Sequence, residues 1–184
     1  DLEKIKKSME MHLHDENVEA LIFNFNHFYG NTNSLLKSPG WYRSEARIIK
    51  NSIRSYAPDG LFWVVLGSNK KGRYPKAKHT GVTCYHYGWV RSEEQMNLKS
   101  KKVQKYWGEM PVVIDYSQMD QLIIQEFHGT HPEVIKDWLP KENGLFKADS
   151  SYKITLKQKK HRIMLKLENF FGLELSKKHY KLIK

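Results

Sequence analysis

The feature that most constrains the fold is the apolar segment at residues 18–29, which has the character of a buried strand. Leu21, Phe23 and Phe25 share one face of this strand, whereas Asn24 falls on the other. A buried strand must satisfy its backbone hydrogen bonds through neighbouring strands. We therefore expect the segment to lie inside a sheet, which excludes an all-helical fold.

Segments of strand and helix character alternate along the rest of the chain. Strands are predicted at 41–51, 61–66 and 82–90, an exposed loop at 68–78, and helices at 2–13, 93–107 and 154–171. Ser92 and Gln95 form a capping-box signature at the start of the second helix. The first helix is expected to pack on the sheet through Leu2, Ile5, Met9 and Leu13. This alternation predicts a mixed α/β or α+β fold.

Positive charge is concentrated at the C-terminal end of the sequence. The net charge is +11, and residues 150–184 hold ten basic side chains against two acidic ones, so residues 1–149 are close to neutral. A localised basic segment attracts nucleic acid or anionic lipid, and it is also typical of the solvated face of a helix. The single cysteine, Cys84, excludes an internal disulfide and a multi-cysteine zinc site.

Two dense stretches carry candidate chemistry. His86 lies near the end of a predicted strand and Arg91 follows it, which places an imidazole and a guanidinium at one rim of the sheet. Imidazole can coordinate a divalent metal, and guanidinium can hold a phosphate. Glu45 shares a strand face with Arg43 and Arg47, whose charges would keep it ionised. A hydrogen-bonded core histidine and a structural ion pair are the alternative interpretations.

Several blocks of sequence follow one another in a recognisable order. They are HFYG at 27–30, WYR at 41–43, RIIKN at 47–51, YHYGWVR at 85–91, DYSQMD at 115–120, FHGTHP at 127–132 and YKLI at 180–183. In these blocks the sequence resembles bacterial family 2 glycosyltransferases, and the resemblance spans nearly the whole chain. The YHYGWVR block is specific, and its combination with HFYG is hard to obtain by chance.

The resemblance implies an α/β fold, namely the C-terminal portion of a Rossmann-like GT-A glycosyltransferase domain with added C-terminal helices. Residues 1–140 would form the acceptor-side part, 141–151 a linker, and 152–184 a basic helical tail outside the chemical site. The nucleotide-binding half would precede Leu2, with a short acidic motif that holds Mg or Mn against the diphosphate. Activity would then belong to a full-length parent enzyme.

For such an enzyme the resemblance implies inverting transfer of a sugar from a nucleotide-sugar donor to the hydroxyl of a glycan or lipid-linked acceptor. His86 would bind the metal or the diphosphate. Glu45 and Asp59 are candidates for the catalytic base, although Asp59 is alternatively a turn residue. The candidate substrate-binding residues are His27, Tyr29, Trp41, Arg43, Trp89 and Arg91. The aromatic residues among them are alternatively part of the core.

Two other functions are compatible with the composition. The pI of about 9.6 suggests a nucleic-acid-binding module, but such a module would spread basic and aromatic residues over one surface, whereas here the excess charge lies near one end. We expect no nucleic-acid partner. A membrane-surface protein would use 154–171 as an amphipathic anchor, which is compatible with transferase activity. The expected location is the cytoplasm, in contact with the inner face of the membrane.

Overall fold

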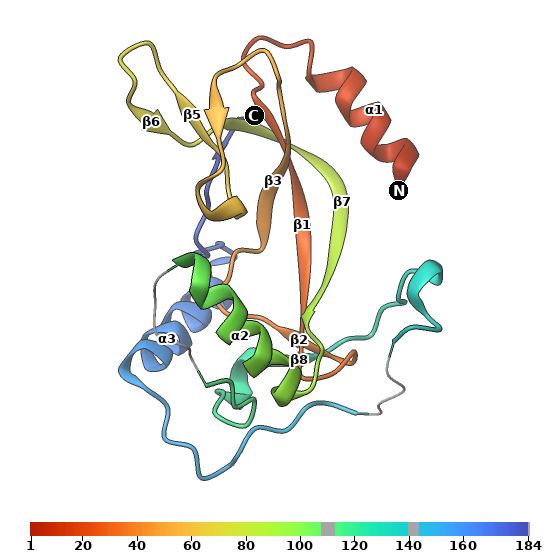
Figure 1. Ribbon diagram of the computed structural model, residues 1–184, viewed down its shortest axis with the longest axis vertical. Helices are drawn as coiled ribbons and strands as arrows, with labels where there is room; N and C mark the ends of the chain where they lie inside the picture. Colours follow the sequence, from red (N-terminus) through yellow and green to blue (C-terminus); the bar gives the residue numbers. More distant parts are fainter. Residues whose placement is uncertain (108–112, 140–143, 184) are drawn as a thin grey trace. The chain divides into compact units, whose positions relative to one another are not determined.

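The computed structural model describes residues 1–107, 113–139 and 144–183 (Figure 1). The chain separates into two compact units. The first contains Asp1–Phe25, Gly40–Cys84 and Ser176–Lys184, and the second contains Asn26–Pro39 and Tyr85–Leu175. The two long strands, β1 (Ala20–Tyr29) and β7 (Lys76–Trp89), contribute residues to both units. The fold is mixed α/β, as the sequence predicts.

The first unit is built on the beginning of β1. Strand β3 (Ser44–Ile49) pairs antiparallel with it, and β9 (Lys181–Leu182) runs parallel to the beginning of β7. A small separate sheet contains β4 (Ser55–Tyr56), β5 (Val64–Leu66) and β6 (Gly72–Arg73), with the 3₁₀ turn η1 at Pro58–Gly60. The expected loop at 68–78 therefore contains β6 and the start of β7. Strand β7 begins at Lys76, earlier than the predicted start at residue 82. These additional residues are mostly polar, and the strand begins with them because the backbone of the first two pairs with β9.

The core of the first unit includes a residue from the C-terminal segment. Its members are Ala20, Ile22, Ala46, Ala77 and Tyr180, with Ile49 and Trp63 packed against them. Tyr180 is buried because residues 176–183 return to the sheet, where β9 lies beside β7. The expectation of a helical tail through 152–184 is therefore wrong for this last segment.

Helix α1 (Leu2–His12) does not pack as predicted. None of its residues is buried, and Leu2 and Met9 are exposed. A hydrogen bond joins the helix to β7, from the Ser8 hydroxyl to the carbonyl of Thr80 (3.4 Å). The side of the helix that carries Ile5 and Ser8 is half-buried. Only part of the predicted apolar stripe is therefore covered.

The second unit contains the end of β1, and its described residues include two helices. Strand β2 (Ser34–Leu36) pairs with β1 through Phe28↔Leu35, and β8 (Ile124–Glu126) pairs with β2. Helix α2 (Glu93–Trp107) has the predicted bounds. Its capping box is confirmed, since the Gln95 amide donates to the Ser92 hydroxyl (3.2 Å) and the Ser92 amide donates to the Gln95 side chain (3.3 Å). Short 3₁₀ turns, η2 (Gln121–Ile123) and η3 (Glu133–Ile135), complete the unit.

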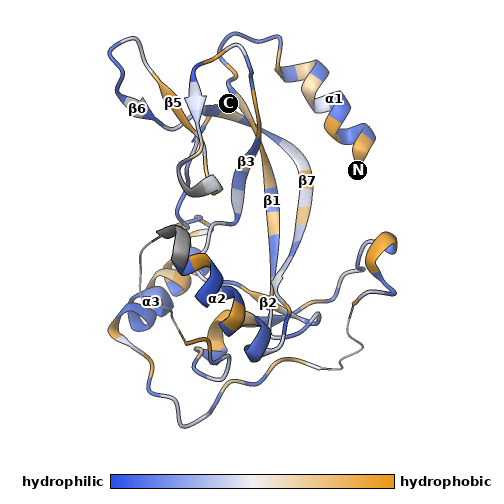
Figure 2. Ribbon diagram, viewed as in Figure 1, coloured by the Kyte–Doolittle hydropathy of each residue, from blue (hydrophilic) through white to orange (hydrophobic). Residues whose placement is uncertain are grey.

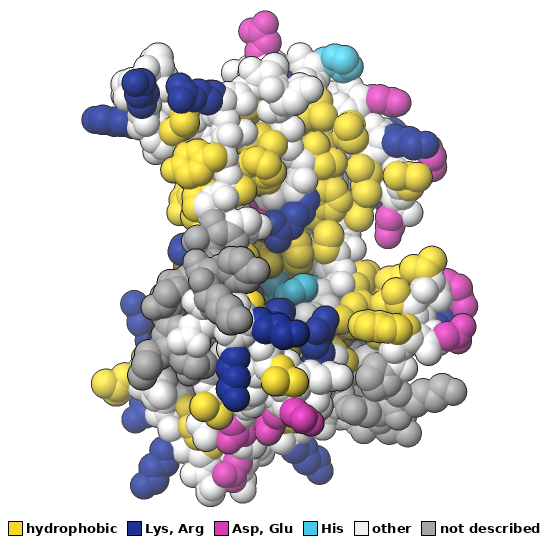
Figure 3. Space-filling model, in the orientation of Figure 1, with side chains coloured by type: hydrophobic (Ala, Val, Ile, Leu, Met, Phe, Trp, Pro, Cys, Tyr) yellow, Lys and Arg dark blue, Asp and Glu magenta, His cyan; other side chains and the backbone are white. Residues whose placement is uncertain are grey.

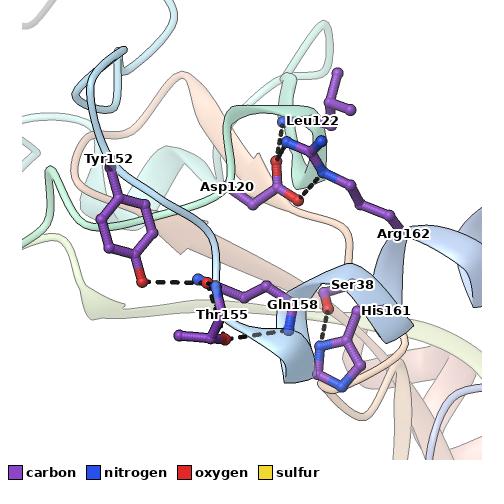
Figure 4. Close-up of polar contacts among 8 residues, drawn as sticks. All are labelled: Ser38, Asp120, Leu122, Tyr152, Thr155, Gln158, His161 and Arg162. Carbon is purple, nitrogen blue, oxygen red and sulfur yellow. Dashed lines mark hydrogen bonds and ion pairs between the residues drawn. The ribbon is translucent and has the colours of Figure 1, made fainter.

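Helix α3 (Leu156–Phe171) is held on the second unit by its inner face (Figure 4). The Arg162 guanidinium donates to both carboxylate oxygens of buried Asp120 (2.6 and 2.7 Å). Burial opposes ionisation of Asp120, but the hydrogen bonds from Arg162 and from the Leu122 amide hold the pKa of this carboxyl below its usual value. Thr155 and Gln158 form a capping box, and Gly172 in the left-handed conformation ends the helix as predicted.

Apolar and polar residues are interspersed on both helices of the second unit (Figure 2). In the described part of the chain, every helix falls short of the length and apolarity that a membrane-spanning helix requires. The linker expected at 141–151 is only partly covered, because residues 140–143 lie outside the described chain. Residues 145–149 have no regular secondary structure.

Replacing Gly30 with alanine should cost more than about 1 kcal/mol of unfolding free energy, because its φ of 73° disfavours a side chain. An added Cβ would also lie 2.5 Å from the Phe146 ring. Gly60→Ala is the matched control, since its φ is 66° and nothing lies within 4 Å of the added Cβ. Urea unfolding of the two variants should show a larger loss at Gly30, and equal losses would contradict the close packing against Phe146.

Candidate active site

Two predicted site residues from distant parts of the sequence meet in the second unit. His27 lies near the end of β1 and His86 near the end of β7, and their Nδ1 atoms are 3.0 Å apart. His27 is buried and His86 is half-buried, and the two rings meet edge to face. In this hydrogen bond one Nδ1 must carry the proton and the other must accept it. The geometry is therefore incompatible with both rings being cationic at once.

Gly88 leaves room for the His86 ring. A Cβ at this position would lie 2.6 Å from Nε2 of His86, closer than non-bonded heavy atoms approach. The glycine in the YHYGWVR block is thus explained by packing against the imidazole two residues before it, on the same face of β7. Gly88 acts as a positioning residue for His86.

An aromatic cluster surrounds the same strand ends. Phe28 is fully buried and stacks on Tyr87 with ring centroids 4.7 Å apart, while Phe127 meets it edge to face and His131 is tilted against it. Burial raises the pKa of Tyr87 to about 12 and lowers the pKa of His131. Tyr87 therefore stays protonated and His131 neutral near pH 7. The two side chains are joined by a hydrogen bond of 2.8 Å between the hydroxyl and Nδ1.

Tyr29 and Trp89, both predicted to bind substrate, lie in a second aromatic cluster with Tyr116 and Phe146. Tyr29 is almost fully buried, and burial raises the pKa of its hydroxyl. Its hydroxyl donates to the carbonyl of Tyr116 (3.5 Å). These contacts favour the alternative interpretation for Tyr29, in which it supports the core and does not face a sugar.

A basic groove begins where β7 ends. Its volume is about 640 Å³, and the residues that line it are Val90, Arg91, Gln95, Leu98, Lys99, Lys102 and Trp138. Those from α2 recur at helical spacing and therefore share one face. Trp138 is 70% exposed, so its ring is available to a ligand. Lys and Arg side chains gather beside hydrophobic ones on the face that Figure 3 shows. Three cations beside an exposed indole suit an anionic ligand that carries a ring.

Glu45 has a different environment from the one predicted. It is fully buried in the first unit, where its Oε2 lies 2.6 Å from Nδ1 of His179 and its Oε1 accepts from the Ala46 amide (3.0 Å). Phe62 stacks on the His179 ring at 4.4 Å, and Nε2 of His179 is buried without a hydrogen-bond partner. The expected carboxylate between two arginines is not found. A buried carboxylate whose oxygens both have partners fits a structural role better than that of a base.

The remaining predicted residues also belong to the first unit. Trp41 and Arg43 are half-buried, and the Arg43 carbonyl accepts from the Phe25 amide (2.8 Å). Arg47 is exposed and lies over the ring of Phe25 at 4.9 Å. The side chain of Asp59 lies outside the described part of the structure.

The described residues contain no group of three or more His, Cys, Asp or Glu side chains placed to hold a metal. His27 and His86 supply two imidazoles, which are suitable donors for a divalent ion but do not by themselves complete a site. Their Nδ1 atoms are occupied by the hydrogen bond between the two rings, so the described residues alone do not form a metal site.

Comparisons of the chain with protein-family models, with curated proteins and with solved structures found no match.

Sequence reasoning missed Lys102, Trp138 and His179. The spacing of Gln95, Lys99 and Lys102 could have revealed one basic face of α2. Nothing local could have paired His179 with Glu45, because they are 134 residues apart in the sequence.

Proposed function

We propose that the chain is the C-terminal part of an inverting glycosyltransferase that uses a nucleotide-sugar donor. The observation that carries the proposal is the contact between His27 and His86. Each belongs to one of the two most distinctive blocks of the family resemblance, and the folded chain brings them within hydrogen-bond distance. Residues that are scattered in the sequence and adjacent in space are expected of a functional site.

In this proposal the basic groove receives the charged part of a substrate. Arg91 and Lys99 offset the charge of the diphosphate, and Trp138 offers a face for a sugar or base ring. Negative charge grows on the leaving diphosphate during transfer, so cations that contact it there stabilise the transition state more than the ground state. A divalent ion, when bound, would offset the same charge, and His86 would supply it with an imidazole nitrogen.

The proposed reaction is a single displacement. The acceptor oxygen forms a bond to the anomeric carbon of the sugar, and the bond from that carbon to the phosphate oxygen breaks. The nucleoside diphosphate leaves with the electron pair, and the acceptor proton passes to a carboxylate base. Glu45 is already bonded to His179, and Asp59 stays a prediction from the sequence for this base.

The test is a donor screen on the full-length gene product, with release of nucleoside diphosphate as the readout. We expect release with at least one nucleotide sugar, and Arg91→Ala with Lys99→Ala should raise the KM for that donor roughly tenfold to hundredfold. Lys71→Ala with Lys153→Ala removes two exposed lysines outside the groove and should leave KM unchanged. The proposal fails if no donor is consumed, or if the groove pair behaves like the control pair.

A further inference from the structure

Helix α3 presents an apolar stripe to solvent. The outer stripe consists of Leu156, Ile163, Leu167, Phe170 and Phe171, whose exposed fractions are 83%, 61%, 43%, 81% and 61%. At about 3.6 residues per turn these residues cluster on one side of the helix. Phe170 and Phe171 also contact each other, with ring centroids 4.8 Å apart. Large apolar side chains gathered on one exposed face mark an interaction site.

The orientation of α3 is fixed, so the exposure of the outer stripe is not a consequence of a loose helix. The opposite face carries Arg162, which pairs with Asp120, and His161, which lies 3.5 Å from the Ser38 hydroxyl (Figure 4). Leu165 is buried on that face. Because the inner face is anchored, the outer stripe must point away from the second unit.

The charges on the outer part of α3 have one sign. Lys157, Lys159, Lys160 and Lys166 are all exposed. Glu168, the acidic residue of the helix, is buried, and its carboxylate accepts from the Leu175 amide (2.6 Å). Arg162 is neutralised by Asp120. These lysines have no acidic neighbour on the outer part of the helix. At about 3.6 residues per turn Lys157, Lys159 and Lys166 flank the apolar stripe, whereas Lys160 lies within it.

We propose that α3 lies on the surface of an anionic lipid bilayer, with the outer stripe in the acyl boundary and its lysines among the headgroups. An amphipathic helix that carries Phe and Leu on one side, with lysines around and among them, has the chemistry of an interfacial helix. The long lysine side chains can reach the headgroups while their stems cover apolar surface. A bilayer with anionic headgroups matches both the apolar and the cationic parts of this face.

Co-sedimentation of the chain with vesicles tests the proposal. The chain should bind vesicles that contain phosphatidylglycerol, bind phosphatidylcholine vesicles much more weakly, and dissociate as salt is raised. Ile163→Ser with Phe170→Ser should weaken binding on the order of 100-fold. Lys159→Gln, Lys160→Gln and Lys166→Gln together should weaken binding to phosphatidylglycerol vesicles by a similar factor. The readout needs no donor sugar, so it is independent of the proposed function.

The matched control is Leu61→Ser with Val134→Ser, which removes two exposed apolar side chains that do not belong to α3 and should leave vesicle binding unchanged. All the substituted side chains are exposed, so circular dichroism should show unchanged folding. The proposal is overturned if the wild-type chain fails to bind phosphatidylglycerol vesicles, or if the lysine variant binds as the wild type does. It is equally overturned if sedimentation velocity shows a dimer that Ile163→Ser with Phe170→Ser dissociates while vesicle binding is absent.

Discussion

Sugar transfer by the full-length protein should fall about 10²–10³-fold when His86 is replaced by alanine, because a contact to charge that develops in the transition state is lost. His86 is only half-buried, and its removal breaks the hydrogen bond at Nδ1 of the buried His27 at a cost of about 1–3 kcal/mol. The melting temperature should therefore fall by several degrees and leave the protein folded at the assay temperature. Turnover per folded molecule and melting temperature, measured on the same preparation, separate the two effects.

His128→Ala is the control for this prediction, since His128 is strongly exposed and contributes to neither the histidine pair nor the groove. Gly88→Ala is a second test of the role of His86. The added methyl group would clash with Nε2 of His86 and displace the imidazole without removing it. This variant should lower turnover in the same direction. If His86→Ala lowers the melting temperature but keeps near-normal turnover per folded molecule, His86 is a structural histidine.

Replacing Glu45 with alanine should cost about 3–5 kcal/mol of unfolding free energy, because removing one partner of a buried pair leaves the other without compensation. The remaining partner is His179, whose side chain is about 10% exposed. Glu16→Ala, at an exposed position, should change stability by less than about 0.5 kcal/mol. Urea unfolding gives both values.

A double-mutant cycle with His179→Ala would show whether the loss comes from this pair, since contacting residues are not additive. We expect the double variant to lose much less than the sum of the single losses. If Glu45→Ala instead keeps its stability and abolishes sugar transfer, Glu45 is the base after all, and the structural interpretation is wrong.

The parts of the fold that could be predicted are those in which local pattern and final structure agree. Helices α2 and α3 carry capping boxes, so their first residues are set by side chains within one turn. Strand β1 combines an apolar run with aromatic residues. Such a segment favours a buried strand, and this holds without knowledge of which strands pair with it. These signals are short-range, and tertiary contacts reinforce them.

The parts that could not be predicted depend on contacts between distant segments. Strand β9 has two residues and shows no alternation of apolar and polar side chains. It is a strand because its backbone pairs with β7. Helix α1 has apolar residues at regular helical spacing. That spacing predicts a helix, but it does not predict how much of the apolar face will be buried. In the site, the resemblance singled out His27 and His86 separately, and only the fold shows that they touch.

The return of the chain to the first unit has a consequence for synthesis. That unit needs three segments, and the last of them, Ser176–Lys184, leaves the ribosome after the whole of the second unit. Before His179 and Tyr180 are synthesised, the Glu45 carboxylate lacks its histidine partner and the apolar surface around Ala77 is exposed to solvent. The second unit can therefore fold while the chain is growing, whereas the first must wait for its closing strand. A nascent chain that stalls before residue 176 would expose this surface to chaperones or aggregation.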